Sequence, residues 1–353
     1  MRPVFFLIVL GGLLAALVAV QRPVPETDLF SAIPAGSRVP FAFPTEPELF
    51  AAKLAHGRLV PRRAIGLFGN SRSVMVGASE LGAAPGRFFN YAVPGSSFRT
   101  SVALAEALAQ AGKLPATVLV SLDHLEIQFD GNPNIRGAWG WLGRLARDVR
   151  IGLRRPDIDW RMVARVAWRH VYVGYHGLAR YFNAEQLAAG IRWRLDGRGA
   201  RAWWRGEPRA DSAGYRRDGS RAEATSKLRR RLAPVGRAAP SVLMGYLIED
   251  LRRLAALKNA GSRIIVYESP LHRPSAERLA RRPSGHAVIM REAVLRACAR
   301  LGLECHGNDP DGPLADAGGW LEPTHPPALA LAAHLNRLMK RPRMGAARSG
   351  PAR

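Results

Sequence analysis

The chain has 353 residues, of which 47% are hydrophobic, so it can bury a substantial core and is too apolar to be a disordered protein. Its formal net charge of +24 indicates a polyanionic partner, such as nucleic acid, anionic lipid or acidic polysaccharide, unless it reflects a genome-wide bias toward arginine. Two cysteines, Cys298 and Cys305, are too few for a structural zinc site. They leave open a disulfide, if the domain is exported, or two buried thiols.

The first element is an uncharged apolar run, VFFLIVLGGLLAALVAV, at residues 4–20. At 1.5 Å per residue it spans roughly 25 Å, enough for a signal-anchor helix. A cleaved signal peptide is the alternative, but Leu17 and Val20 give a poor small-residue pattern around Ala19. We therefore expect a retained transmembrane helix within residues 1–22. The protein would be a single-pass protein of a bacterial-type inner membrane, with its C-terminal domain outside the cytoplasm.

Residues 23–60 predict a linker followed by a short helix from about Glu46 to His56. Beyond them, short apolar runs alternate with amphipathic stretches. The runs predict buried parallel strands at Ala64–Phe68, Phe88–Ala92, Thr117–Leu122, Arg263–Glu268 and Leu303–His306. The stretches predict helices at Ser96–Gly112, Ser241–Gly261, His286–Gly302 and Pro326–Arg341. This alternation predicts a three-layer α/β/α domain with a parallel sheet, made of residues 61–131 and 241–341.

The segment 132–240 interrupts the alternation and predicts an inserted helical subdomain. It holds 24 Lys plus Arg against 9 Asp plus Glu, and seven of the eight tryptophans. Aromatic and arginine side chains of this kind suit an acidic polysaccharide or anionic lipid headgroups, while a helical cap with solvated arginines is the plain alternative. Single-stranded nucleic acid ranks last, because an exported domain rarely meets it. The tail, residues 342–353, is basic and predicted to be disordered.

A candidate nucleophile follows the first predicted strand, in Gly69-Asn70-Ser71-Arg72-Ser73. Reactive groups in open α/β sheets gather at the carboxyl ends of strands, which is where Ser71 falls. A serine needs a base that removes its proton and an acid that orients the base. His325 and Glu322 lie three residues apart in one loop before the last helix and meet that need. The backbone N–H groups of Ser71 and Gly95 are candidate donors to an oxyanion.

These short blocks resemble those of the SGNH (GDSL-like) hydrolase superfamily, which has a flavodoxin-like fold. Gly69–Ser73 is similar to the first block, G-D-S-x-S, with Asn70 in place of Asp. Asn90–Gly95 is similar to the second block, and Glu322–His325 to the last block, D-x-x-H, with Glu in place of Asp. The resemblance implies a Ser71–His325–Glu322 triad, an oxyanion hole that includes Gly95, and no metal or organic cofactor. The predicted N-terminal anchor makes the membrane-anchored branch of the superfamily, which acts on envelope polymers, an apt comparison.

The third block, G-x-N-D, departs from the family pattern, because Asp123 stands where an asparagine that donates to the oxyanion is expected. Asn90 or Asn70 is a candidate substitute donor. Arg72 is a candidate for contact with an anionic substrate and Asp123 is a further substrate-binding candidate, whereas His124 is more often structural. The sequence thus predicts a membrane-anchored serine esterase or O-acyltransferase acting on envelope glycan or lipid esters. The alternative is a catalytically impaired module of this fold that binds envelope polymer or scaffolds an acyltransferase.

Overall fold

The computed structural model of the chain describes residues 30–31, 46–94, 96–123, 215–221, 240–271, 273, 286–307, 314 and 326–341. All of these lie in one structural unit, formed by Asp28–Ile135 together with Pro208–Arg353. The predicted anchor at residues 4–20, most of the predicted insertion at 132–240 and the tail at 342–353 lie outside the described residues.

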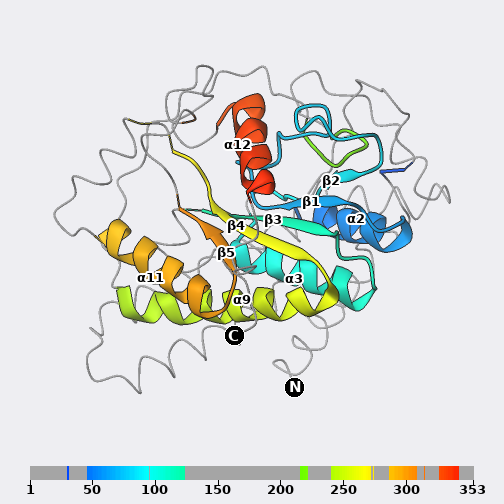
Figure 1. The fold of residues 1–353 in the computed structure, drawn as a ribbon. Coiled ribbons are helices and arrows are strands. Elements are labelled where there is room, and N and C mark those ends of the chain that lie inside the picture. Colours follow the sequence, from blue (N-terminus) through cyan, green and yellow to red (C-terminus); the bar gives the residue numbers. More distant parts are fainter. Residues whose placement is uncertain are drawn as a thin grey trace, which may run out of the picture. The chain divides into compact units, whose positions relative to one another are not determined.

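The centre of this unit is a five-stranded parallel sheet (Figure 1). Its strands are β1 Ile65–Phe68, β2 Phe88–Asn90, β3 Thr117–Leu122, β4 Arg263–Glu268 and β5 Glu304–His306. Their order across the sheet, β2-β1-β3-β4-β5, is that of the doubly wound, flavodoxin-like sheets. The prediction of a parallel α/β sheet is confirmed, and each predicted strand is present within one or two residues of its expected bounds. The chain reverses direction across the sheet between β1 and β3, which is the position where such sheets bind ligands.

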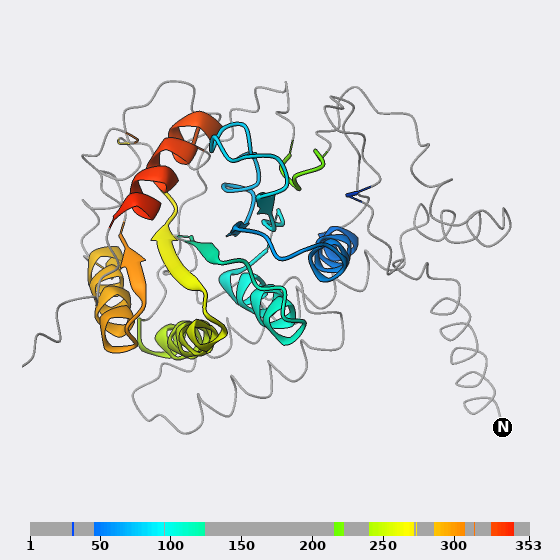
Figure 2. The ribbon, with the colours of Figure 1, turned by 45° about the vertical axis from the view of Figure 1, so that its right-hand side comes forward.

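Helices cover both faces of the sheet and give it three layers (Figures 1 and 2). One face carries α12, and the other carries α3, α9 and α11. The helices are α2 Glu46–Leu59, α3 Phe98–Gln110, α9 Pro240–Ala256, α11 His286–Arg300 and α12 Ala328–Lys340. The predicted helix at Ser241–Gly261 tightens into a 3₁₀ turn at Leu257–Ala260 and ends on Gly261, whose φ of 73° is the left-handed conformation that glycine favours.

The strands are apolar along their length because both faces are buried. In β3, all residues after the first are buried. On the face under α12, the side chains of Leu331 and Leu335 pack with Leu67, Leu119 and Ile265 from three neighbouring strands. These side chains are at most 1% exposed, so α12 is fixed firmly over the middle of the sheet.

Residues 215–221, which the sequence assigns to the insertion, pack against the sheet domain instead. Asp218 accepts a bond from the Ala78 N–H through its carboxylate at 2.6 Å, and its carbonyl accepts one from the Asn90 N–H at 2.7 Å. Gly219 has a φ of 77°, and a side chain there would lie 2.4 Å from the Asn90 carbonyl. This stretch is therefore a close-fitting part of the α/β domain, next to the carboxyl end of β2.

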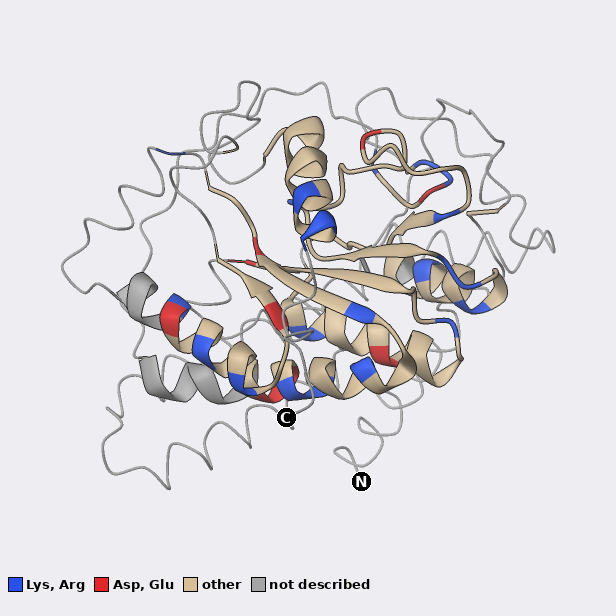
Figure 3. Cartoon of the chain, in the orientation of Figure 1, with Lys and Arg blue, Asp and Glu red and all other residues tan. Residues whose placement is uncertain are grey.

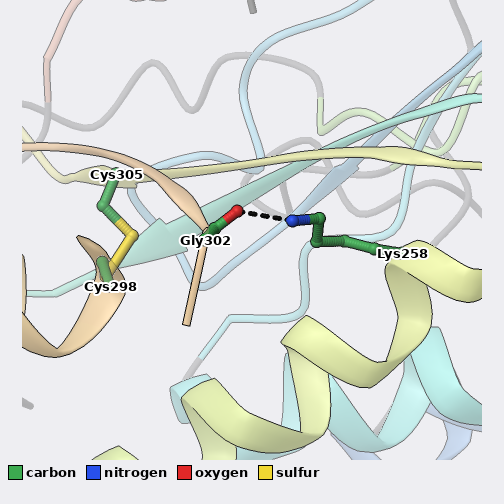
Figure 4. Close-up of a disulfide and its surroundings, with 4 residues drawn as sticks. All are labelled: Lys258, Cys298, Gly302 and Cys305. Carbon is green, nitrogen blue, oxygen red and sulfur yellow. Dashed lines mark hydrogen bonds between the residues drawn. A yellow bond between two sulfur atoms is a disulfide. The ribbon is translucent and has the colours of Figure 1, made fainter. Parts of the chain in front are cut away.

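Cys298 and Cys305 form a disulfide that links the end of α11 to β5 (Figure 4). Their Cα atoms are 6.1 Å apart, within the usual range for a disulfide. Nearby, the Lys258 ammonium donates to the Gly302 carbonyl at 2.6 Å, which ties the turn between α11 and β5 to the 3₁₀ turn after α9. Of the two states that the sequence leaves open, the structure has the disulfide.

Charged side chains of both signs are interleaved along α9 and α11 (Figure 3). Arg99 bonds Asp250 across the α3–α9 contact, and Arg296 bonds Glu292 on the surface of α11. Some of the many arginine side chains therefore form ion pairs within the domain. Among the helices in the described part of the chain, none has the length and apolar character needed to cross a membrane.

Candidate functional site

The turn after β1 carries the predicted nucleophile at the carboxyl edge of the sheet. It begins at Gly69, where a side chain would come within 2.7 Å of β3 and of the Ser73 hydroxyl. The Asn70 carbonyl accepts a bond from the Ser73 N–H at 3.1 Å, and the Asn70 side-chain oxygen accepts one from the Arg72 N–H at 3.1 Å. Ser71 is only partly buried, so solvent reaches a residue whose neighbours on both sides are held in place.

The loop after β2 lies against the same turn. The carbonyl of Gly69 accepts bonds from the Val93 N–H and from the Ser96 hydroxyl, each at 2.9 Å. Val93 and Ser96 flank the segment that contains Gly95, the predicted second oxyanion donor, which itself lies outside the described residues. The two loops that carry the predicted nucleophile and the predicted donor are thus bonded to each other.

Asn90, at the end of β2, has a structural role. Its side chain is fully buried, and its amide nitrogen donates to the carbonyls of Ser73 at 2.9 Å and Val76 at 2.7 Å, with Val74 at 3.3 Å. Its side-chain oxygen accepts from the Ala92 N–H at 2.8 Å. Because both amide hydrogens already point to backbone carbonyls, Asn90 has none to give to an oxyanion. The candidate role of Asn90 as an oxyanion donor is incompatible with these contacts.

Arg72 and Asp123 form a buried ion pair across the ends of β1 and β3. The Arg72 guanidinium bonds Oδ1 of Asp123, and the two side chains are only 5% and 7% exposed. Oδ2 of the same carboxylate accepts from the Asn70 amide at 2.8 Å. The sequence suggests both charged residues as contacts for a substrate, whereas the structure pairs them with each other. The charge of Asp123 is therefore compensated inside the protein.

A cluster of buried hydroxyl groups lies beneath the nucleophile turn. The Tyr267 hydroxyl, from β4, is 2.8 Å from the Ser73 hydroxyl, and Ser121 Oγ is 2.5 Å from Ser269 Oγ. Burial raises the pKa of Tyr267 to about 12, while its bonds to the Ser73 and Ser121 hydroxyls act in the opposite direction. Tyr267 therefore stays neutral and connects the turn to the middle strands. Its position one residue before the carboxyl end of a predicted strand was the available sequence signal.

Lys53, which the sequence analysis missed, is a fully buried ammonium beside the loop after β2. It donates to the carbonyls of Asn90, Ala92 and Gly219 at 2.6–2.8 Å. Burial lowers the pKa of Lys53 well below its ordinary value, and the nearby Asp218 carboxylate opposes that shift. The available signal was a lysine on the inward face of a short helix. The buried positions of that helix, at helical spacing, are Leu49, Ala52, Lys53 and His56.

The remaining predicted site residues, Glu322, His325, Gly95 and His124, lie outside the described residues. The helix that follows His325 is described. The carbonyls of Leu338 and Met339 near the end of α12, and of Arg341 just after it, accept bonds from the guanidinium of Arg263, the first residue of β4. Since α12 ends at the amino edge of the sheet, it begins toward the carboxyl edge. Buried Pro326, which precedes this helix, thus lies toward the edge that carries Ser71.

Comparisons with protein-family models, curated proteins and solved structures find no match to this chain. In the described part of the chain, no group of three or more His, Cys, Asp or Glu is placed to hold a metal ion. A functional assignment therefore depends on the geometry at the carboxyl edge of the sheet and on the short sequence blocks.

Proposed function

We propose that the protein is a serine esterase or O-acyltransferase with an SGNH-like fold, anchored in a membrane by residues 4–20. The observation that carries this proposal is the placement of Ser71. It is partly exposed, it follows β1 at the switch point of the sheet, and it sits on a turn fixed by bonds to the neighbouring loops. A nucleophile needs this combination of access and a fixed position.

In the proposed reaction, the Ser71 hydroxyl attacks an ester carbonyl while His325, oriented by Glu322, takes its proton. The tetrahedral oxyanion accepts bonds from the Ser71 and Gly95 N–H groups. The carbonyl then reforms, the alcohol of the ester leaves with the proton from His325, and an acyl-enzyme remains. Water or a sugar hydroxyl next attacks this acyl-enzyme and gives its own proton to His325, which returns it to Ser71 Oγ as the acid or the new ester leaves. The resemblance favours glycan or lipid esters of the cell envelope as substrates.

The disulfide supports a location outside the cytoplasm, because such bonds persist in oxidising compartments. A periplasmic or otherwise extracytoplasmic domain behind an N-terminal anchor would meet acidic polysaccharide and anionic lipid, both of which suit the charge of +24.

Labelling with a fluorophosphonate probe tests the proposal on the full chain in detergent. Wild type is expected to be labelled, and both Ser71→Ala and His325→Ala are expected to lose the label. Ser79→Ala is the matched control, because Ser79 is an exposed serine eight residues along the same segment, and its hydroxyl bonds the Glu80 carboxylate. Equal labelling of wild type, Ser71→Ala and His325→Ala would rule out Ser71 as the nucleophile.

A second candidate, a catalytically impaired module of this fold, is favoured by one observation. Asp123 occupies the position of the expected asparagine, and its carboxylate has no hydrogen to donate while it is paired with Arg72. This candidate predicts a folded wild-type protein that takes no label yet binds acidic polysaccharide with an affinity that falls as salt increases.

A further inference from the structure

The Asn70 carboxamide is held in one orientation by two bonds of opposite sense. Its oxygen accepts from the Arg72 backbone N–H at 3.1 Å, and its nitrogen donates to Asp123 Oδ2 at 2.8 Å. A backbone N–H can only donate and an ionised carboxylate can only accept, so the two ends of the amide cannot be exchanged. The side chain is thus fixed at the residue that precedes Ser71.

A carboxamide nitrogen carries two hydrogens, and the bond to Asp123 uses one. Among the described residues, no acceptor for the second hydrogen is present, and Asn70 is partly exposed. Asn90 differs on both points, because it is fully buried and its amide hydrogens are directed to backbone carbonyls. Of the two asparagines at this edge, only Asn70 retains a hydrogen for a bound group.

From these contacts we infer that Asn70 is a third donor to the oxyanion, and that Asp123 and Arg72 are the residues that position it. This inference rests on the proposed Ser71 chemistry. Asp123 holds the amide through one oxygen and bonds Arg72 through the other. Bonds to an ionised acceptor are stronger than neutral ones, so the carboxylate orients the amide firmly. Arg72 compensates the carboxylate, which would otherwise repel the developing oxyanion.

The arrangement is a reciprocal exchange of two side chains that touch. In the superfamily blocks that this chain resembles, a carboxylate stands at the position of residue 70 and an amide at the position of residue 123. This chain has the amide at 70 and the carboxylate at 123. Because the two groups are bonded to each other, an exchange keeps one donor amide, one orienting carboxylate and one charge opposite Arg72.

The exchange defines the experiment, which uses the full chain in detergent. The variants are Asn70→Asp, Asp123→Asn and the double exchange. The readouts are kcat and KM for p-nitrophenyl acetate and the rate of phosphonylation of Ser71. Asn70→Asp replaces the donor with a second carboxylate and is expected to lower kcat by about 10²–10³-fold with KM little changed. Asp123→Asn removes the carboxylate that bonds Arg72 and orients the Asn70 amide, and it is expected to be slower than wild type.

The double exchange is expected to return kcat to within about tenfold of wild type, because the amide now stands at position 123 and the carboxylate at position 70. If the pair had a purely structural role, the double exchange would restore the melting temperature without restoring kcat. If Asn70→Asp does not fold, Asn70→Ala removes the donor without adding charge and is expected to show the same loss. Asn336→Ala is the matched control, since the Asn336 side-chain amide bonds the Leu81 carbonyl on another part of the domain.

Two results would overturn the inference alone: a folded Asn70→Asp protein with kcat within threefold of wild type, or a folded double exchange no faster than Asn70→Asp. In both cases wild type would still be labelled at Ser71. A wild-type protein that is not labelled at Ser71 would instead overturn the proposed function, and the inference with it.

Discussion

Replacing Arg72 with methionine tests whether the buried ion pair stabilises the site. The substitution keeps an unbranched side chain of similar reach and removes the guanidinium that bonds the Asp123 carboxylate, which is 7% exposed. Breaking a buried pair by removing one partner costs about 3–5 kcal/mol. Asp123 retains the bond from Asn70, so we expect the lower end, about 3 kcal/mol. In a domain of this size, that loss lowers the melting temperature by about 6–12 °C.

Urea unfolding followed by circular dichroism measures this loss of unfolding free energy. The matched control is Arg296→Met, because Arg296 and Glu292 are 63% and 59% exposed and such a pair contributes no more than about 0.5 kcal/mol. Adding Asp123→Asn to Arg72→Met removes the buried negative charge and is expected to recover part of the stability. A loss below about 1 kcal/mol in Arg72→Met would refute the view that Arg72 compensates a buried carboxylate.

Three further predictions concern the groups around the site. The pKa of Tyr267 is raised to about 12 from an ordinary 10.0, so the folded state holds this proton more tightly than the unfolded chain does. The free energy of unfolding should therefore fall by about 2–3 kcal/mol as the pH rises from 10 through 12. Tyr267→Phe should lack this loss in urea unfolding between pH 9 and 12, and parallel curves would contradict it. Lys53→Met should lower the unfolding free energy by about 2–4 kcal/mol, since three buried carbonyls lose their donor. The lowered pKa of Lys53 means that the unfolded chain binds more protons, so the wild type, unlike the variant, should gain stability as the pH rises toward 10.5. The Cys298→Ala/Cys305→Ala variant should be about 2 kcal/mol less stable than the oxidised wild type, and a reductant should destabilise the wild type alone.

The sheet could be predicted from the sequence because buried parallel strands are apolar along their whole length. Thr117–Leu122 and Arg263–Glu268 have the predicted bounds, since each contains an uninterrupted apolar run, Val118–Val120 in the first and Ile264–Tyr267 in the second. Residues 215–221 could not be assigned in this way. Their attachment depends on backbone bonds to Asn90 and Val74 and on the close fit of Gly219, and none of these leaves a periodic signal.

The position of Ser71 followed from general rules for α/β sheets, whereas the surroundings of the turn did not. The pairing of Arg72 with Asp123 joins residues 51 positions apart, and it exists because β1 and β3 are neighbours in the sheet. From sequence, the two charges could equally have faced a substrate. The role of Asn90 was also beyond sequence reasoning, because its amide bonds backbone carbonyls that any residue type would present.

Asp123 is the strongest argument against catalysis, because its carboxylate would repel the oxyanion. The structure weakens this argument, because Arg72 is paired with that carboxylate. An isolated carboxylate 4 Å from an oxyanion would raise the barrier by about 4 kcal/mol at an effective dielectric constant of 20. With the Arg72 guanidinium bonded to one carboxylate oxygen, the two charges form a compact neutral pair whose field falls off quickly. The cost to the oxyanion then falls well below that of the free carboxylate. What separates an enzyme from an impaired module at this site is therefore whether an amide replaces the missing donor, and Asn70, bonded to that same carboxylate, is the group placed to do so.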